Sequence, residues 1–116
     1  MKDARRRTRD VVDQFFPVMH RDNEELIGYL TDVTVDGGML ESEAALPEGE
    51  IYPFRIELSE EVGGGRFIDL DARCKWTRKD RNAVFHYSGF EFLELASPER
   101  ERIVELAERY RLTMSR

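Results

Sequence analysis

The fold is decided by the stretch IYPFRIEL at residues 51–58, in which apolar side chains recur at every second position. This alternation predicts a strand with one buried face. Residues 67–77 repeat the pattern, and their expected inner face comprises Ile68, Leu70, Ala72, Cys74 and Trp76. Because a strand that is buried on both faces reads as a continuous apolar run, the alternation favours an antiparallel sheet.

Four further segments read as strands: residues 14–20, 26–34, a segment that begins at residue 39, and 83–95. Polar or glycine-containing turns separate them, and a loop with three glycines is expected at residues 60–65. Pro17 marks an edge strand or a bulge, because proline cannot donate a ladder hydrogen bond. Six strands with no helix between them indicate a mainly β fold, an antiparallel sandwich or barrel.

The last expected element is an amphipathic helix at about residues 97–112. Ser97 is a good N-cap, and Pro98 suits the first helical position. An apolar stripe at helical spacing consists of Ile103, Leu106, Ala107 and Tyr110. We expect this stripe to dock on the sheet, and a helix that binds a partner is the alternative.

Composition predicts one globular domain: the 116 residues are 41% hydrophobic and 36% charged. No apolar run approaches the roughly 18 residues that a membrane helix needs. The basic N-terminus has no apolar stretch behind it, so it is not a secretory signal. The only cysteine, Cys74, suits a reducing compartment. The expected location is therefore the cytoplasm, without membrane insertion.

Charge is distributed unevenly along the chain. Residues 1–9 hold five basic side chains against Asp3 alone, a net +4, which leaves −10 on the remainder of a chain whose total is −6. An acidic body argues against general binding to nucleic acid, which relies on many phosphate contacts. A small basic segment on such a body suits a compact anion, and a solubilising tail is the alternative.

Two short motifs give a more specific signal. RRRTR at residues 5–9 contains Arg-x-x-x-Arg, formed by Arg5 and Arg9, and DVTVDG at residues 32–37 reads Asp-x-Thr-x-x-Gly. In this order and at this spacing, they resemble the signature of PilZ domains, which bind the bacterial second messenger cyclic di-GMP.

The resemblance continues along the chain. ARCKW at residues 72–76, GFEF at residues 89–92 and LASPE at residues 95–99 resemble the family's fifth strand, last strand and strand-to-helix junction. The resemblance implies a six-stranded antiparallel β-barrel with a C-terminal helix at residues 12–116. A flexible arginine-rich arm at residues 1–11 would precede it.

The resemblance also implies a binding site for cyclic di-GMP. The expected contacts are Arg5, Arg6, Arg9, Asp32, Thr34 and Gly37. Thr34 stands where the family usually has serine, which keeps the hydroxyl and adds a methyl group. Ala4 occupies the position that the family links to binding of one or two ligand molecules, and it offers no charge, so the stoichiometry stays open.

These residue types suit the ligand chemically. An arginine fork pairs with a phosphate or with guanine O6 and N7, and its flat face stacks on a purine. The Asp32 carboxylate can accept the N1–H and N2–H donors of guanine, and Thr34 is expected on the same strand face. Gly37 permits a turn with positive φ and close approach of a ligand. The structural alternative is that the Asp-Gly-Gly sequence at residues 36–38 is simply a good hairpin turn.

Catalysis is not expected from this chain. His20, His86 and Cys74 lie on different segments, and no His or Cys pair has metal-ligand spacing. We therefore expect a receptor without a cofactor that orders its arm when cyclic di-GMP binds and relays the signal to a protein partner, as a monomer or weak dimer. Two rivals are a PilZ-fold interaction module that binds no nucleotide, and a basic-arm protein that binds an acidic partner or nucleic acid non-specifically.

Overall fold

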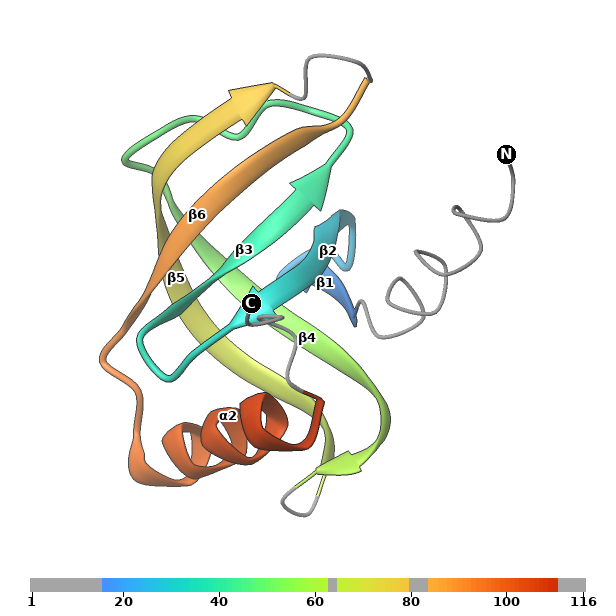
Figure 1. Ribbon diagram of the computed structural model, residues 1–116, viewed down its shortest axis with the longest axis vertical. Helices are drawn as coiled ribbons and strands as arrows, with labels where there is room; N and C mark the ends of the chain where they lie inside the picture. The colour runs from blue at the N-terminus through green and yellow to red at the C-terminus, as the bar shows by residue number, and fades with distance from the viewer. Residues whose placement is uncertain (1–15, 63–64, 80–83, 111–116) are drawn as a thin grey trace.

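The computed structural model describes residues 16–62, 65–79 and 84–110, in which six strands precede one helix. The elements are β1 (Phe16–His20), β2 (Leu26–Val33), β3 (Gly37–Ser42), β4 (Ile51–Val62), β5 (Gly65–Lys79), β6 (His86–Leu93) and α2 (Ser97–Tyr110). The strands form a closed antiparallel barrel in the order β1-β2-β3-β6-β5-β4 (Figure 1).

Pairing of β1 with both β2 and β4 closes the barrel. This confirms the predicted six-stranded antiparallel barrel. Alternation alone had left a sandwich and a barrel as alternatives, and the structure is the barrel. The suggestion that Pro17 marks an edge is wrong, because β1 has a neighbour on each side. The bulge in this strand lies just after it, between Val18 and Met19.

The barrel interior is the hydrophobic core, and alternation along β4 and β5 fills it. Its inward side chains on these two strands include Phe54, Ile56, Leu58, Ile68, Leu70, Ala72 and Cys74, all of them buried. Trp76 does not join this cluster, because a bulge between Cys74 and Trp76 changes which face the following residue occupies. The prediction that Trp76 lies on the inner face is therefore wrong.

β4 and β5 are also longer than predicted. β4 continues to Val62, which pairs with Gly65 at the start of β5. The loop expected from residue 60 is therefore confined to a shorter connection, because the ladder between the two strands extends into the glycine-containing segment.

Helix α2 covers one end of the barrel (Figure 1). Ile103 and Leu106 are fully buried and belong to the same core as the strands, which confirms docking of the apolar stripe. Burial of each of these side chains contributes about 1.5–3 kcal/mol. No helix in the described part of the chain is long and apolar enough to cross a membrane.

Candidate ligand-binding site

A row of four paired residues crosses neighbouring strands on one side of the barrel. Asp32 on β2 pairs with Met39 on β3, Met39 pairs with Gly89 on β6, and Gly89 pairs with Trp76 on β5. Adjacent strands lie about 4.8 Å apart, so the path from Asp32 to Trp76 along the curved sheet covers three strand spacings, about 14 Å. A surface hollow of about 290 Å³ follows this row, and Thr34, Gly37 and Lys75 also line it.

Two β-bulges shape the ends of the row. One lies in β2 between Leu30 and Asp32, and the other lies in β5 between Cys74 and Trp76. A bulge inserts an extra residue and re-aims the side chains beside it, and for this reason bulges are frequent next to binding sites. Here they accompany a carboxylate at one end of the hollow and an indole at the other.

Glycines on the two middle strands keep the hollow open. A Cβ at Gly89 would collide with the indole nitrogen of Trp76, so only glycine lets the ring lie against β6. A Cβ at Gly37 would collide with the carbonyl oxygen of Phe90. Gly49 is the only glycine with positive φ among the described residues, so Gly37 does not adopt the positive φ that a glycine permits. The structure requires glycine at position 37 because β3 and β6 approach closely there.

Asp32 carries the unusual electrostatics of the site. Its Oδ1 is buried and has no hydrogen-bond partner within the described residues. Burial raises the pKa of the Asp32 carboxyl above the usual 3.8, and a hydrogen bond from the Val33 backbone acts in the opposite direction. A desolvated acceptor without a partner costs free energy, because hydration has been lost and not replaced. Donors brought to this oxygen would recover that loss.

Thr34 lies just after the end of β2 and organises the turn. Its backbone N–H donates to the Gly37 carbonyl at 2.8 Å, and its hydroxyl oxygen accepts from the Asp36 N–H at 3.3 Å. Strand alternation therefore does not place Thr34 beside Asp32, although both residues line the hollow. The turn also holds to β6, because the Phe92 N–H donates to the Asp36 carbonyl at 2.9 Å. This segment is therefore a hairpin turn, as the structural alternative states, and the same turn also borders the hollow.

The structure brings Asp32, Thr34 and Gly37 together, as the motif predicts. The three arginines predicted to complete the site, Arg5, Arg6 and Arg9, lie outside the described residues, as does the boundary expected near residue 11. Their part in the site stays a prediction.

Sequence reasoning missed Trp76 and Lys75 as site residues. Arg78 lies over the Trp76 ring, 4.9 Å from its centroid, and Lys75 forms an ion pair with Glu91 at 3.2 Å. A guanidinium that lies over an aromatic ring forms with it a layered cationic surface on which a nucleobase can stack. The available signal was Gly89 in the following strand, since a glycine often faces a large aromatic side chain across a sheet.

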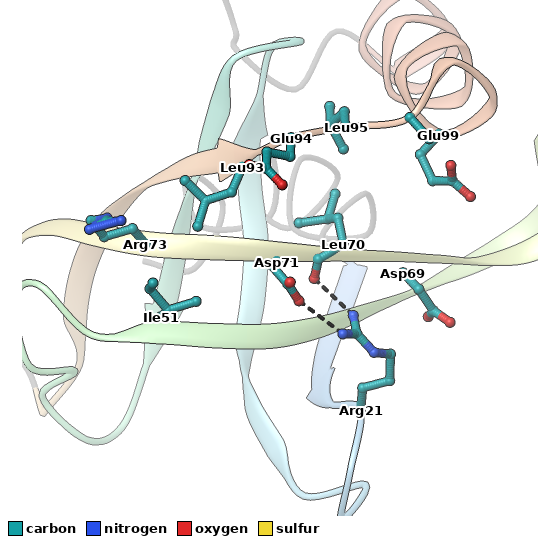
Figure 2. Close-up of a pocket in the computed structure, with 11 residues that line it drawn as sticks. Arg21, Ile51, Asp69, Leu70, Asp71, Arg73, Leu93, Glu94, Leu95 and Glu99 are labelled. Carbon is teal, nitrogen blue, oxygen red and sulfur yellow. Dashed lines mark hydrogen bonds and ion pairs between the residues drawn. The ribbon is translucent and has the colours of Figure 1, made fainter.

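A larger hollow, of about 600 Å³, lies where β5 approaches the segment between β6 and α2 (Figure 2). Its lining includes four acidic side chains, Asp69, Asp71, Glu94 and Glu99, against two basic ones, Arg21 and Arg73. This excess of negative charge disfavours an anionic ligand. The smaller hollow at Asp32 is therefore the better candidate for a nucleotide, despite its size.

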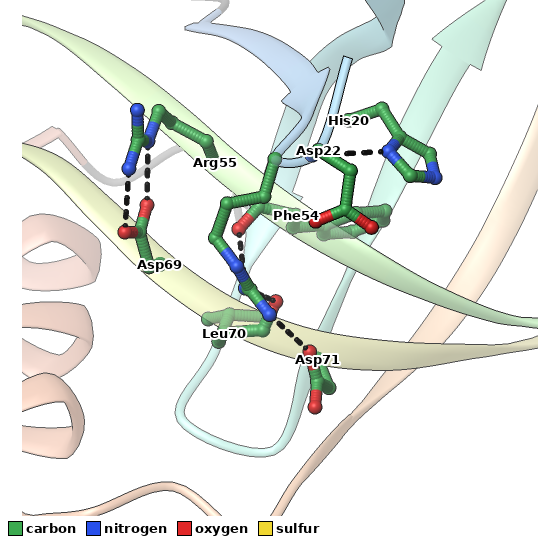
Figure 3. Close-up of polar contacts among 8 residues, drawn as sticks. His20, Asp22, Phe54, Arg55, Asp69, Leu70 and Asp71 are labelled. Carbon is green, nitrogen blue, oxygen red and sulfur yellow. Dashed lines mark hydrogen bonds and ion pairs between the residues drawn. The ribbon is translucent and has the colours of Figure 1, made fainter. Parts of the chain in front are cut away.

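Several charged groups around the larger hollow hold the barrel together (Figure 3). The Arg21 guanidinium donates to the Phe54 and Leu70 carbonyls at 3.2 and 3.1 Å and to the Asp71 carboxylate at 2.8 Å. Arg55 donates to both oxygens of Asp69, at 2.8 and 2.9 Å, and lowers the pKa of that carboxyl below its usual 3.8. These contacts tie the β1–β2 turn to β4 and β5 and link β4 to β5.

Comparisons with known proteins agree with this geometry. The model of the PilZ domain family matches residues 3–109. Among solved structures, Bacillus subtilis MotI/DgrA, an inhibitor of motility, has the same fold with a TM-score of 0.69 and 19% identity, over 90% of this chain and 50% of that one. This chain thus spans about half of the Bacillus protein.

The PilZ domain of Escherichia coli YcgR, solved with cyclic di-GMP, superposes with a TM-score of 0.57 and 19% identity, over 84% of each chain. At this level of identity, the two solved structures establish a common fold. No curated protein sequence matches this chain.

Proposed function

The chain belongs to the PilZ domain family, and from that premise we propose that it is a non-enzymatic cytoplasmic receptor for cyclic di-GMP. The observation that carries the proposal is the buried Oδ1 of Asp32, which has no partner in the described part of the chain and lines the hollow opposite Trp76. An acceptor at one end and an aromatic ring at the other suit the N–H edge of one guanine and the flat face of the second guanine of the ligand.

In the proposed complex, a guanine donates N1–H and N2–H to the Asp32 carboxylate. A purine face stacks in the region of Trp76, where the indole and the Arg78 guanidinium already lie one over the other. The three arginines of the arm, Arg5, Arg6 and Arg9, supply the charge that the two phosphates require. The Gly37 turn brings the backbone of β3 close to the ligand.

Signalling follows from the arm in this proposal. Residues 1–9 carry a net +4, and cyclic di-GMP carries two negative charges. Binding would fold residues 1–11 across the hollow and change the surface that a partner protein meets. Amide resonances of residues 5–9 should then leave random-coil positions when ligand is added, and resonances already at structured positions without ligand would contradict the switch.

Isothermal titration calorimetry tests the receptor proposal directly. The wild type should bind cyclic di-GMP with micromolar or tighter affinity, and Arg9→Ala should weaken binding. Arg7→Ala is the matched control: it removes the same charge from the same cluster, but Arg7 lies outside the Arg-x-x-x-Arg pair.

Equal losses in both arginine variants, together with steep weakening by salt, would indicate binding through net charge alone. Absence of binding by the wild type would leave the fold intact and assign the chain to PilZ-fold interaction modules that bind no nucleotide.

A further inference from the structure

Exposed apolar side chains gather at the end of the β2–β3 hairpin that is remote from Asp32. Leu26, Tyr29 and Phe85 are 52%, 42% and 36% exposed, and all three line a groove of about 560 Å³. Val84, which precedes Phe85, is 68% exposed. Large apolar side chains that cluster on a surface mark interaction sites, whereas isolated ones do not.

The groove lies where the ladder between β2 and β3 ends. It is built from the start of β2, the end of β3 and the residue before β6, and these strands are neighbours in the barrel (Figure 1). Each of these strands has a neighbour on both sides in the closed barrel, but the β2–β3 ladder ends at the pair of Tyr29 and Glu41. Leu26, Ile27 and Gly28 therefore have no described pairing partner on β3. The exposed apolar side chains that a bound segment can cover are Leu26 and Phe85.

Charge around the groove specifies the occupant. Glu41 and Glu43 line it, and no lysine or arginine is among its described lining residues. An apolar floor with an acidic rim complements an apolar anchor flanked by basic residues.

We propose that this groove, lined by Leu26, Tyr29, Glu43 and Phe85, docks a segment of a partner protein in which an apolar anchor is flanked by lysine or arginine. The role of this contact in signalling rests on the proposed receptor function, whereas the contact itself does not. Leu26 and Asp32 lie six residues apart on β2, about 20 Å along the strand. The ligand and the partner therefore engage opposite ends of one hairpin and can bind together.

Selection from a phage-displayed library of random linear peptides on the full chain, without cyclic di-GMP, tests the proposal. The selected peptides should combine an aromatic or aliphatic residue with neighbouring lysine or arginine. Fluorescence polarisation with a selected peptide should show roughly tenfold weaker binding to Phe85→Ser, the typical loss of one buried anchor. Glu43→Lys should weaken binding several-fold, and more at low ionic strength than at high.

Two variants serve as controls. Val104→Ser removes an apolar side chain that is 38% exposed on α2, outside the groove, and should leave peptide affinity unchanged. Asp32→Ala should also leave it unchanged, because Asp32 belongs to the ligand site. If the protein binds the peptide but is found unable to bind cyclic di-GMP, the docking proposal stands and only the receptor proposal is refuted.

Other results would overturn the proposal. The proposal is wrong if the selection yields no peptides or yields peptides without basic residues. It is also wrong if Phe85→Ser and Glu43→Lys leave the peptide affinity unchanged. A synthetic peptide of residues 1–15 that competes for the groove would identify the chain's own N-terminal segment as the occupant. Self-association in sedimentation that Phe85→Ser abolishes would identify a second copy.

Discussion

Asp32→Ala should weaken binding of cyclic di-GMP strongly without weakening the fold. In the proposed complex the variant loses two charge-assisted hydrogen bonds, from guanine N1–H and N2–H. Such bonds contribute about 1.5–3 kcal/mol each. Asp32 is only partly buried, so the lower figure applies, and a total of about 3 kcal/mol corresponds to roughly 150-fold in Kd. Asp32→Asn retains one acceptor oxygen, so its affinity for cyclic di-GMP should lie between that of Asp32→Ala and that of the wild type.

Asp32→Ala should not reduce the stability of the fold as it reduces ligand affinity. The wild type buries Oδ1 without a partner among the described residues, and the alanine variant removes that cost while losing the hydrogen bond from Val33. We expect the free energy of unfolding to stay within about 1 kcal/mol of the wild type or to rise. A residue that costs stability and supports binding is a functional residue rather than a structural one.

The pH dependence of the unfolding free energy provides a second test of this expectation. Because the folded-state pKa of Asp32 is raised above 3.8, the folded protein holds this proton more tightly than the unfolded chain does. The wild type therefore loses stability through this group as pH rises from 3.8 through the folded pKa, and the loss persists above it. Asp32→Ala should lack this decline.

Calorimetric titration gives the affinities, and urea unfolding at several pH values gives the stabilities. An Asp32→Ala variant that binds as tightly as the wild type would refute the assignment of Asp32 to the guanine edge. A loss of more than about 2 kcal/mol in unfolding free energy would show that the carboxylate has a structural partner, since loss of a buried hydrogen-bond network has that magnitude.

Four further expectations can be measured with simple assays. Trp76→Ala should weaken ligand binding roughly 5- to 150-fold, the value of one base stacked on an aromatic ring; because Trp76 is the only tryptophan, quenching of its fluorescence by cyclic di-GMP reports the contact in the wild type. Gly37→Ala should cost about 1–3 kcal/mol in urea unfolding through its collision with β6, whereas Gly49→Ala, in open space at a φ of 90°, should cost only the backbone strain of about 1 kcal/mol. The Arg55–Asp69 pair should contribute stability that is present above pH 3.8 and lost as pH falls through the lowered folded pKa of Asp69. Asp69→Asn should therefore reduce the fall in unfolding free energy at acid pH and leave ligand binding unchanged. Cyclic di-AMP should bind roughly 100-fold more weakly than cyclic di-GMP, because adenine presents an acceptor at N1 to the Asp32 carboxylate, and Asp32→Ala should narrow that difference in calorimetry.

The strands could be predicted from sequence because their alternation is local. Phe54, Ile56 and Ile68 face inward as their spacing indicates. Closure of the barrel could not be predicted in this way, because it depends on pairing between β1 and β4, for example Val18 with Ile56, and no local pattern encodes that pairing. The family resemblance supplied it.

The errors at the site arise from features that the sequence of one strand does not show, namely a bulge and a close approach between strands. Trp76 follows the inward alternation of β5 in sequence, and one bulge moves it to the site. Gly37 looks like a turn glycine in sequence, yet the structure requires it because a Cβ would collide with β6. Asp32 was found through its motif, but the burial of its oxygen follows from the fold around it. Residue type and spacing thus identified candidates, and only the sheet showed which physical requirement each one meets.

The geometry separates recognition from charge neutralisation. Asp32 and Trp76 stand on strands of a closed barrel, so their separation is fixed before ligand arrives and little entropy is lost in positioning them. The basic residues 1–9, in contrast, are the part of the chain whose charge opposes that of the phosphates. Salt should therefore weaken binding of any cyclic dinucleotide to a similar degree, because screening acts on phosphate charge. Discrimination between bases should resist salt, because it depends on the Oδ1 atom of Asp32, which is buried and which ions in solution screen poorly.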